Sequence, residues 1–166
     1  LEMTDISLRS VVEEVVDPYA LPALALRRVT IDIEEDAIVR SDRGALVAVL
    51  GNLVSNAVKY SHEGDEVRVV AGASPEAVRF TVANTGSHID RQDLERVFDR
   101  FYRTATARDS AVPGTGIGLA VSRALAAALG GSLTADEVAE GASFTLRLPT
   151  RAAESDQPPE AMEASA

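Results

Sequence analysis

Apolar residues recur every three or four positions in three stretches of the chain, a period typical of helices with one buried face. The three predicted helices cover residues 8–16, 42–59 and 116–129. Asp5 and Ser7 are candidate caps for the first helix, because their side chains can accept hydrogen bonds from its unpaired N–H groups. A fourth, short helix is expected to begin at Asp90 or Asp93 and to reach Phe98.

Alternating apolar and polar residues predict strands elsewhere in the chain. The predicted strands cover residues 28–34, 66–73, 78–84, 132–138 and 142–148. We interpret this order as an α/β (α+β) protein, a two-layer sandwich in which three main helices lie on one face of a mixed sheet of about five strands. The segment 103–113 is polar and Ala-rich and carries no period, so it is expected to be mobile.

Composition limits the class of protein. Apolar residues make up 46% and charged residues 25%, as in an ordinary globular domain, and the net charge of −10 disfavours a nucleic-acid partner. The absence of cysteine excludes disulfides and thiolate metal sites, and no apolar run approaches the roughly 20 residues of a membrane span. We expect one domain over residues 1–149 and a disordered acidic tail over residues 150–166.

Three glycines stand at alternate positions directly before the last predicted helix: Gly114, Gly116 and Gly118. Glycine lets the backbone approach a ligand closely, and the start of a helix offers unpaired N–H groups and the positive end of the helix dipole. Together these features favour an anion such as phosphate, although a plain glycine-rich loop is the alternative.

Asn52 and Asn56 are i,i+4 neighbours in the second predicted helix and therefore share a face. Asn is an uncommon choice inside a helix, and two amide oxygens on one face suit a hard cation such as Mg²⁺. Lys59, one turn further on, is placed to meet a phosphate. The alternative is a solvated polar stripe.

Four segments, in this order along the chain, resemble the sequence boxes of the catalytic ATP-binding domain of sensor histidine kinases. Residues 52–61 resemble the N-box, residues 97–103 the F-box and residues 114–120 the second glycine box, while residues 82–90 stand where the first glycine box is expected. The resemblance covers the chain from about Thr4 to Pro149 and implies the Bergerat-type fold shared with gyrase, Hsp90 and MutL ATPases.

The resemblance implies ATP and Mg²⁺ as ligands. By similarity, Asn56 is expected to be the main Mg²⁺ ligand, with Asn52 assisting it directly or through water, and Thr145 to line the adenine pocket, although an ordinary strand threonine is the alternative there. The other residues expected at the nucleotide are Lys59, Tyr60, Asn84, Gly86, Gly114, Thr115, Gly116, Gly118 and Leu119.

The same resemblance assigns a catalytic role to the F-box. Arg103, together with Arg100, is expected to supply positive charge to the phosphoryl group being transferred, and a solvated surface pair is the alternative. Phe98, Phe101 and Tyr102 are expected to anchor the lid, residues 104–113, when it closes.

The chain departs from the family pattern at two positions. The first glycine box normally begins with Asp, which accepts a hydrogen bond from the adenine amino group, whereas this chain has Asn84. A neutral acceptor is weaker, so we expect adenine affinity to fall by ~1–2 kcal/mol. His88 replaces a glycine of that box, where it would be strained at a positive φ and would crowd the nucleotide, fold over it or point outward. These departures keep open the alternative of a degenerate nucleotide-binding or docking module with weak or no kinase activity.

The residue four positions before the expected metal-binding Asn56 indicates the type of reaction. Related ATPases and serine kinases resemble one another in carrying a Glu general base four residues earlier, where this chain has Asn52. An Asn at this position fits phosphoryl transfer to a neutral imidazole instead. The family's acceptor His lies on a dimerising helical hairpin outside this chain, so we expect a monomer that binds Mg·ATP without autophosphorylation. Its expected partners are that dimerisation domain and a response regulator, and its expected location is the cytoplasm, within a parent protein that the family allows to be membrane-anchored.

Overall fold

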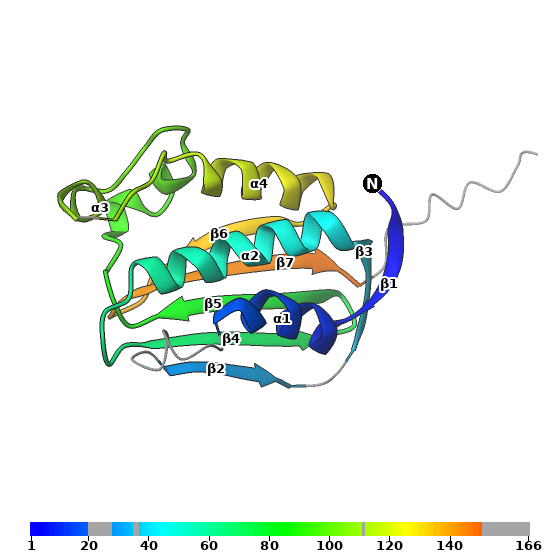
Figure 1. The fold of residues 1–166 in the computed structure, drawn as a ribbon. Helices are drawn as coiled ribbons and strands as arrows, with labels where there is room; N and C mark the ends of the chain where they lie inside the picture. Colours follow the sequence, from blue (N-terminus) through cyan, green and yellow to red (C-terminus); the bar gives the residue numbers. More distant parts are fainter. Residues whose placement is uncertain (20–27, 35–36, 111, 151–166) are drawn as a thin grey trace, which may run out of the picture.

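The computed structural model describes residues 1–19, 28–34, 37–110 and 112–150. Its three longer helices are α1 (Leu8–Val16), α2 (Arg43–Lys59) and α4 (Gly118–Ala128), and they cover one face of a five-stranded sheet (Figure 1). The predicted acidic tail lies outside the described residues from position 151 onward. In the described part of the chain, no helix combines the length and apolar character needed to cross a membrane.

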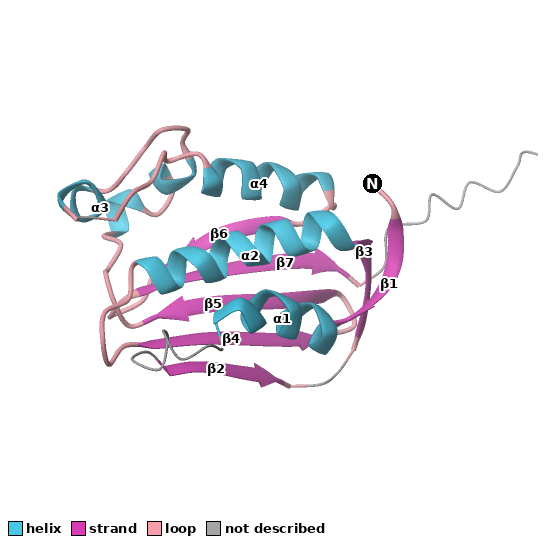
Figure 2. Ribbon diagram, viewed as in Figure 1, coloured by secondary structure: helices cyan, strands magenta, loops and turns pink. Residues whose placement is uncertain are grey.

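The sheet has the strand order β2-β4-β5-β7-β6. The strands are β2 (Arg28–Ile33), β4 (Glu66–Ala73), β5 (Ala77–Asn84), β6 (Ser132–Asp136) and β7 (Ala142–Pro149). β2 pairs parallel with β4 and the remaining pairs are antiparallel, so the sheet is mixed (Figure 2). This confirms the predicted two-layer α/β sandwich.

The core lies between the helices and the sheet. Leu46, Leu50 and Leu53 of α2 belong to the same buried cluster as Phe80 of β5, and each is at most 1% exposed. Successive side chains of a strand point to opposite faces, so the other face of the sheet carries exposed side chains such as Arg79. The strand pattern thus fixes which face the helices cover.

Side-chain caps set the start of the first two helices. Ser7 accepts from the N–H of Ser10 at 3.2 Å, which confirms it as a cap of α1. Asp42 caps α2 by accepting from the N–H of Ala45 at 2.9 Å, and this bond, with another from Glu2, holds the pKa of Asp42 below its ordinary value of 3.8. The prediction of Asp5 as a cap is wrong, because Asp5 lies in a strand.

Several elements differ from the sequence prediction. The strands β1 (Met3–Ser7) and β3 (Ile38–Asp42) form a separate antiparallel pair that was not predicted. The expected short helix over residues 90–98 is two 3₁₀ turns, η3 (Arg91–Asp93) and η4 (Arg96–Phe98), and a further turn, η1 (Asp17–Tyr19), follows α1. The expected mobile segment contains a one-turn helix, α3 (Ala105–Asp109).

Candidate functional site

Most of the predicted site residues line one cavity of about 500 Å³. It is bordered by α2, by the start of α4, by the segment between Tyr102 and Gly116, and by the first residues of β7. The predicted residues that line it are Asn52, Asn56, Lys59, Tyr60, Arg103, Gly114, Thr115, Gly116, Gly118 and Leu119. Residues separated by more than 60 positions therefore form one wall in the folded chain.

The charge of the cavity is opposite to that of the chain. Among the described residues its lining includes Lys59 and Arg103 but neither Asp nor Glu, although the chain as a whole carries a net charge of −10. Two cations without an acidic neighbour in the wall favour an anionic ligand.

The start of α4 adds backbone donors to this wall. Ile117, at the N-cap, makes no side-chain bond to the first N–H groups of the helix, and the neighbouring Gly116 and Gly118 line the cavity. Unpaired N–H groups at the positive end of a helix are suited to phosphate. The geometry therefore agrees with the anion-binding interpretation of the glycine run.

The backbone conformation at position 116 requires a glycine. Its φ is +72°, and a β-carbon there would lie 2.7 Å from the carbonyl carbon of Phe101 and 2.8 Å from the oxygen of Tyr102. The N–H of Phe101 in turn donates to the carbonyl of Gly116 at 2.9 Å. This contact joins the F-box segment to the glycine run.

Asn52 and Asn56 both reach the cavity from one face of α2. The Asn52 amide donates through Nδ2 to the hydroxyl of Ser122 on α4 at 3.0 Å. A β-carbon at Gly118 would stand 2.7 Å from Asn52 Oδ1, so a glycine there is what leaves room for the amide. Neutral oxygen donors on a cavity wall fit a hard cation such as Mg²⁺.

Arg103 is hydrogen-bonded to the segment that is predicted to form the lid. Its Nη2 donates to the carbonyl oxygens of Ala107, at 2.9 Å, and Val112, at 2.8 Å. Thr104 caps α3 by accepting from the N–H of Ala107 at 3.1 Å, and Thr104 and Thr106 line the cavity. Two residues of the predicted lid are therefore bonded to an arginine that also lines the cavity.

The aromatic residues of the F-box have different roles. Phe98 is buried and packs edge-to-face on Phe144 of β7, with ring centroids 6.2 Å apart. The hydroxyl of Tyr102 donates to Asp93, and this bond raises the pKa of Tyr102 above its ordinary value. Phe101 is 73% exposed at a φ of +65°, so its role in anchoring the lid on closure stays a prediction.

Arg100 is exposed and does not line the cavity, which separates it from Arg103. Thr145 also lies elsewhere, since its hydroxyl donates to Asp136 at 2.7 Å on the face of the sheet away from the helices. Its neighbours Ala142 and Phe144 line the cavity in its place. The alternation along β7 could have predicted this placement, because Phe144 lies an even number of residues from the buried Leu residues of the strand and therefore on their face.

One end of the cavity is formed by the loop after β5. His88 lines the cavity, and its Nδ1 lies 2.9 Å from the carbonyl oxygen of Gly141. A carbonyl only accepts, so Nδ1 carries the proton of this bond. His88 is not among the described residues with positive φ, so the expected strain does not arise, and although it is exposed it borders the cavity.

Asn84 precedes this loop as the last residue of β5. It is 6% exposed, it is absent from the cavity lining, and its Nδ2 has no hydrogen-bond partner. A buried amide donor without an acceptor is unusual in a folded protein.

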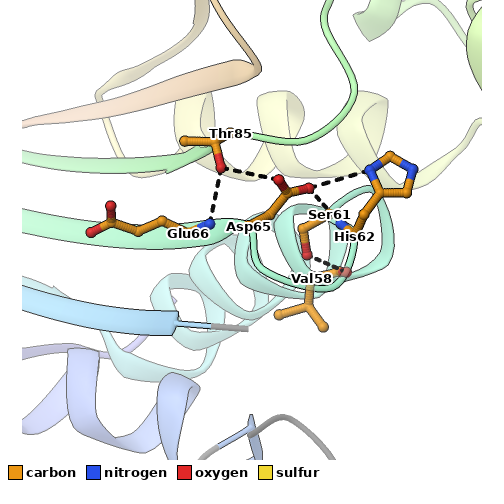
Figure 3. Close-up of polar contacts among 6 residues, drawn as sticks. All are labelled: Val58, Ser61, His62, Asp65, Glu66 and Thr85. Atoms are coloured by element: carbon orange, nitrogen blue, oxygen red, sulfur yellow. Dashed lines mark hydrogen bonds and ion pairs between the residues drawn. The ribbon is translucent and has the colours of Figure 1, made fainter. Parts of the chain in front are cut away.

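The loop after β5 is tied to the turn that follows α2 (Figure 3). Asp65 accepts from the N–H of His62 at 2.6 Å and from the hydroxyl of Thr85 at 3.4 Å, and the first of these bonds chiefly lowers the pKa of Asp65. A β-carbon at Gly86 would lie 2.2 Å from the carbonyl oxygen of Tyr60. Gly86 therefore permits this close packing, and it does not itself line the cavity.

Comparison with known proteins gives consistent matches. Residues 41–152 match the family model of histidine kinase-, DNA gyrase B- and HSP90-like ATPases. The chain is 37% identical over 126 residues to sensor histidine kinase WalK of Bacillus subtilis, which covers 74% of this chain and 21% of WalK. The curated relatives that the chain matches are longer proteins, of which it spans between 21% and 39%.

Solved structures show the same fold. The mycobacterial sensor histidine kinase MprB superposes with a TM-score of 0.79 at 25% identity, covering 89% of this chain and 99% of that one. Full-length ShkA in complex with AMPPNP superposes with a TM-score of 0.78 at 28% identity, covering 92% of this chain and 32% of ShkA.

Proposed function

The chain belongs to the family of histidine kinase-, DNA gyrase B- and HSP90-like ATPases, and from this membership we propose that it binds Mg·ATP and presents it to a phospho-accepting histidine on a separate domain. The observation that carries the proposal is the composition of the cavity wall. Lys59, Arg103 and the uncapped start of α4 supply positive charge and N–H donors, and no carboxylate stands among the described lining residues. The bound AMPPNP of ShkA, a structure with the same fold, supports a nucleotide as the ligand.

We assign the Mg²⁺ to Asn56, with Asn52 beside it. Both amides reach the cavity from one face of α2, and amide oxygens are suitable ligands for Mg²⁺ when water fills the remaining positions. The ion would neutralise charge on the phosphates. In this assignment Lys59 and Tyr60 face the phosphates, and Arg103 adds positive charge at the phosphoryl group being transferred.

The proposed reaction is transfer to an imidazole rather than hydrolysis. Activation of a water or hydroxyl nucleophile is commonly the task of a carboxylate base, and the described lining offers none. Asn52 stands in the same wall as an amide, which cannot accept the proton as a base. A neutral imidazole is already nucleophilic and needs less activation by a general base.

We propose two partners, the dimerisation domain that carries the acceptor histidine and a response regulator that receives the phosphoryl group. Since the proposed ligand is ATP, the domain is proposed to work in the cytoplasm, and it is expected to be monomeric by itself. No finding favours the alternative of a docking module without nucleotide chemistry.

The reaction is tested with γ-labelled ATP. The chain is incubated alone and with an isolated dimerisation hairpin that carries the acceptor histidine, and Asn56→Ala serves as the inactive control. The proposal expects label on the hairpin and none on the chain. Stable label on the chain itself, or release of free phosphate without a partner, would contradict it.

A further inference from the structure

Asp93, the last residue of η3, is a buried carboxylate that the proposed reaction leaves unused. It is 7% exposed and does not line the cavity. Within the described part of the chain it forms no ion pair, and the hydroxyl of Tyr102 is the one side-chain group that donates to it. Because a buried carboxylate is costly when its donor is lost, this bond keeps the two residues together.

Tyr102 is fixed by its hydroxyl, its ring and its backbone. The hydroxyl donates to Asp93, and the guanidinium of Arg96 lies 4.5 Å from the centre of the ring. The carbonyl oxygen packs so closely on Gly116 that a β-carbon there would stand 2.8 Å from it. The bond to Asp93 also raises the pKa of Tyr102, so the hydroxyl retains the proton that it donates.

Arg103 follows this fixed tyrosine directly and lines the cavity. A β-carbon at Gly114 would stand 3.7 Å from its Nε and 3.7 Å from its Nη2, so the guanidinium lies against the glycine run. Nη2 is bonded to the carbonyl oxygens of Ala107 and Val112, which leaves Nε and Nη1 free of bonds to the described residues. A displacement of about 1 Å in a group that acts on reacting atoms can lower a rate about a hundredfold. The position of this arginine therefore matters for its proposed role.

We infer that Asp93 is a positioning residue for phosphoryl transfer, which acts through Tyr102 to hold Arg103 at the phosphoryl group. The inference rests on the proposed function and adds a residue to it. Asp93 lies outside the cavity, and Tyr102 presents the same ring to the cavity with or without its hydroxyl. Loss of their bond should therefore lower the rate of transfer more than the affinity for Mg·ATP, a split that distinguishes positioning from direct contact with the nucleotide.

The test measures transfer from γ-labelled ATP to the isolated hairpin, together with calorimetric binding of Mg·ATP to the whole chain. Asp93→Ala and Tyr102→Phe each remove the bond, so each should lower the transfer rate at saturating Mg·ATP at least about tenfold and change the dissociation constant less than about threefold. The double variant should be no slower than the slower single variant, because both changes remove the same bond. Asp93→Asn keeps an oxygen that accepts from Tyr102, and its rate should stay within about threefold of the unmodified chain.

Tyr19→Phe is the matched control, because it removes a tyrosine hydroxyl outside the cavity and should leave both the rate and the affinity unchanged. An unchanged rate in Asp93→Ala and Tyr102→Phe, or a loss of rate matched by an equal loss of affinity, would overturn the inference and leave the proposed function standing. An equal loss of rate in Asp93→Asn and Asp93→Ala would also overturn it. Absence of transfer by the unmodified chain would overturn both. Tyr102→Phe and Asp93→Asn decide the matter even if Asp93→Ala does not fold.

Discussion

Asn52 of α2 and Ser122 of α4 are joined by a hydrogen bond of 3.0 Å from Asn52 Nδ2 to Ser122 Oγ. Ser122 is 2% exposed, so this bond is made at the buried contact between the two helices. It engages the NH₂ group of the amide and leaves the amide oxygen as the group available to a cation or its waters. Ser122 is in this sense a positioning residue for the proposed Mg²⁺ site.

Ser122→Ala should therefore weaken both the fold and the site. The loss of one buried hydrogen bond is expected to lower the free energy of unfolding by about 1 kcal/mol, and the freed Asn52 amide should raise the dissociation constant for Mg·ATP about threefold or more. Urea unfolding and calorimetry measure the two effects. Ser55→Ala, on α2 but outside the cavity, is the control, and an unchanged dissociation constant in Ser122→Ala would contradict the positioning role.

Asn56→Ala should remove the Mg²⁺-dependent part of ATP binding. Loss of the main amide ligand is expected to raise the dissociation constant at least about tenfold when Mg²⁺ is present. The same titration in excess EDTA supplies the control, because there the variant and the unmodified chain should bind ATP alike. An equal loss in both conditions would show that Asn56 supports the fold rather than the metal.

Gly116→Ala should loosen the contact between the F-box and the glycine run. A β-carbon there meets the Phe101 backbone at 2.7 Å and is strained at a φ of +72°, so a destabilisation of about 1–3 kcal/mol is expected. Gly51→Ala is the matched control, since no atom lies within 4 Å of its added carbon inside α2. That change should stabilise the chain by about 0.5–1 kcal/mol. Thermal unfolding of the pair gives the comparison, and an equal effect of both changes would refute the strain.

Asp65 should make stability depend on pH in the acid range. Its pKa in the folded chain lies below the ordinary value of 3.8, so its contribution is complete above that value and is lost as the pH falls through the folded pKa. The stability advantage of the unmodified chain over Asp65→Asn should be present at neutral pH and should shrink under acid conditions. Denaturant unfolding at several pH values tests this, with exposed Glu63→Gln in the same turn as the control. An advantage that does not change with pH would argue against titration of Asp65.

The sequence was sufficient for elements whose signals are local. The apolar period of α2 and the alternation of β4 and β5 predict those elements because each buries one face against a single core. β1 was missed because Ile6 is its one buried residue, and a five-residue strand with one buried position carries no readable period. Its pairing with β3 depends on contacts between residues up to 39 positions apart, such as Met3 with Asp42.

The site residues were predicted best where the sequence motif and the helical spacing indicate the same positions. Asn52, Asn56 and the glycine run all reach the cavity, because helical spacing already placed the two amides on one face. Thr145 does not reach the cavity because it alternates with the buried Phe144 and Leu146 of β7, so its side chain lies on the other face of the sheet, which the motif alone does not indicate. The partner of Asn52 is 70 positions away on another helix, and no local pattern indicates such a contact.

Calorimetry with Mg·ATP on the unmodified chain tests the central claim most directly. The proposed function predicts saturable binding to one site, weaker when Mg²⁺ is withheld, because the cavity supplies cations, N–H donors and amide oxygens together. No saturable binding of Mg·ATP up to millimolar concentration would contradict it.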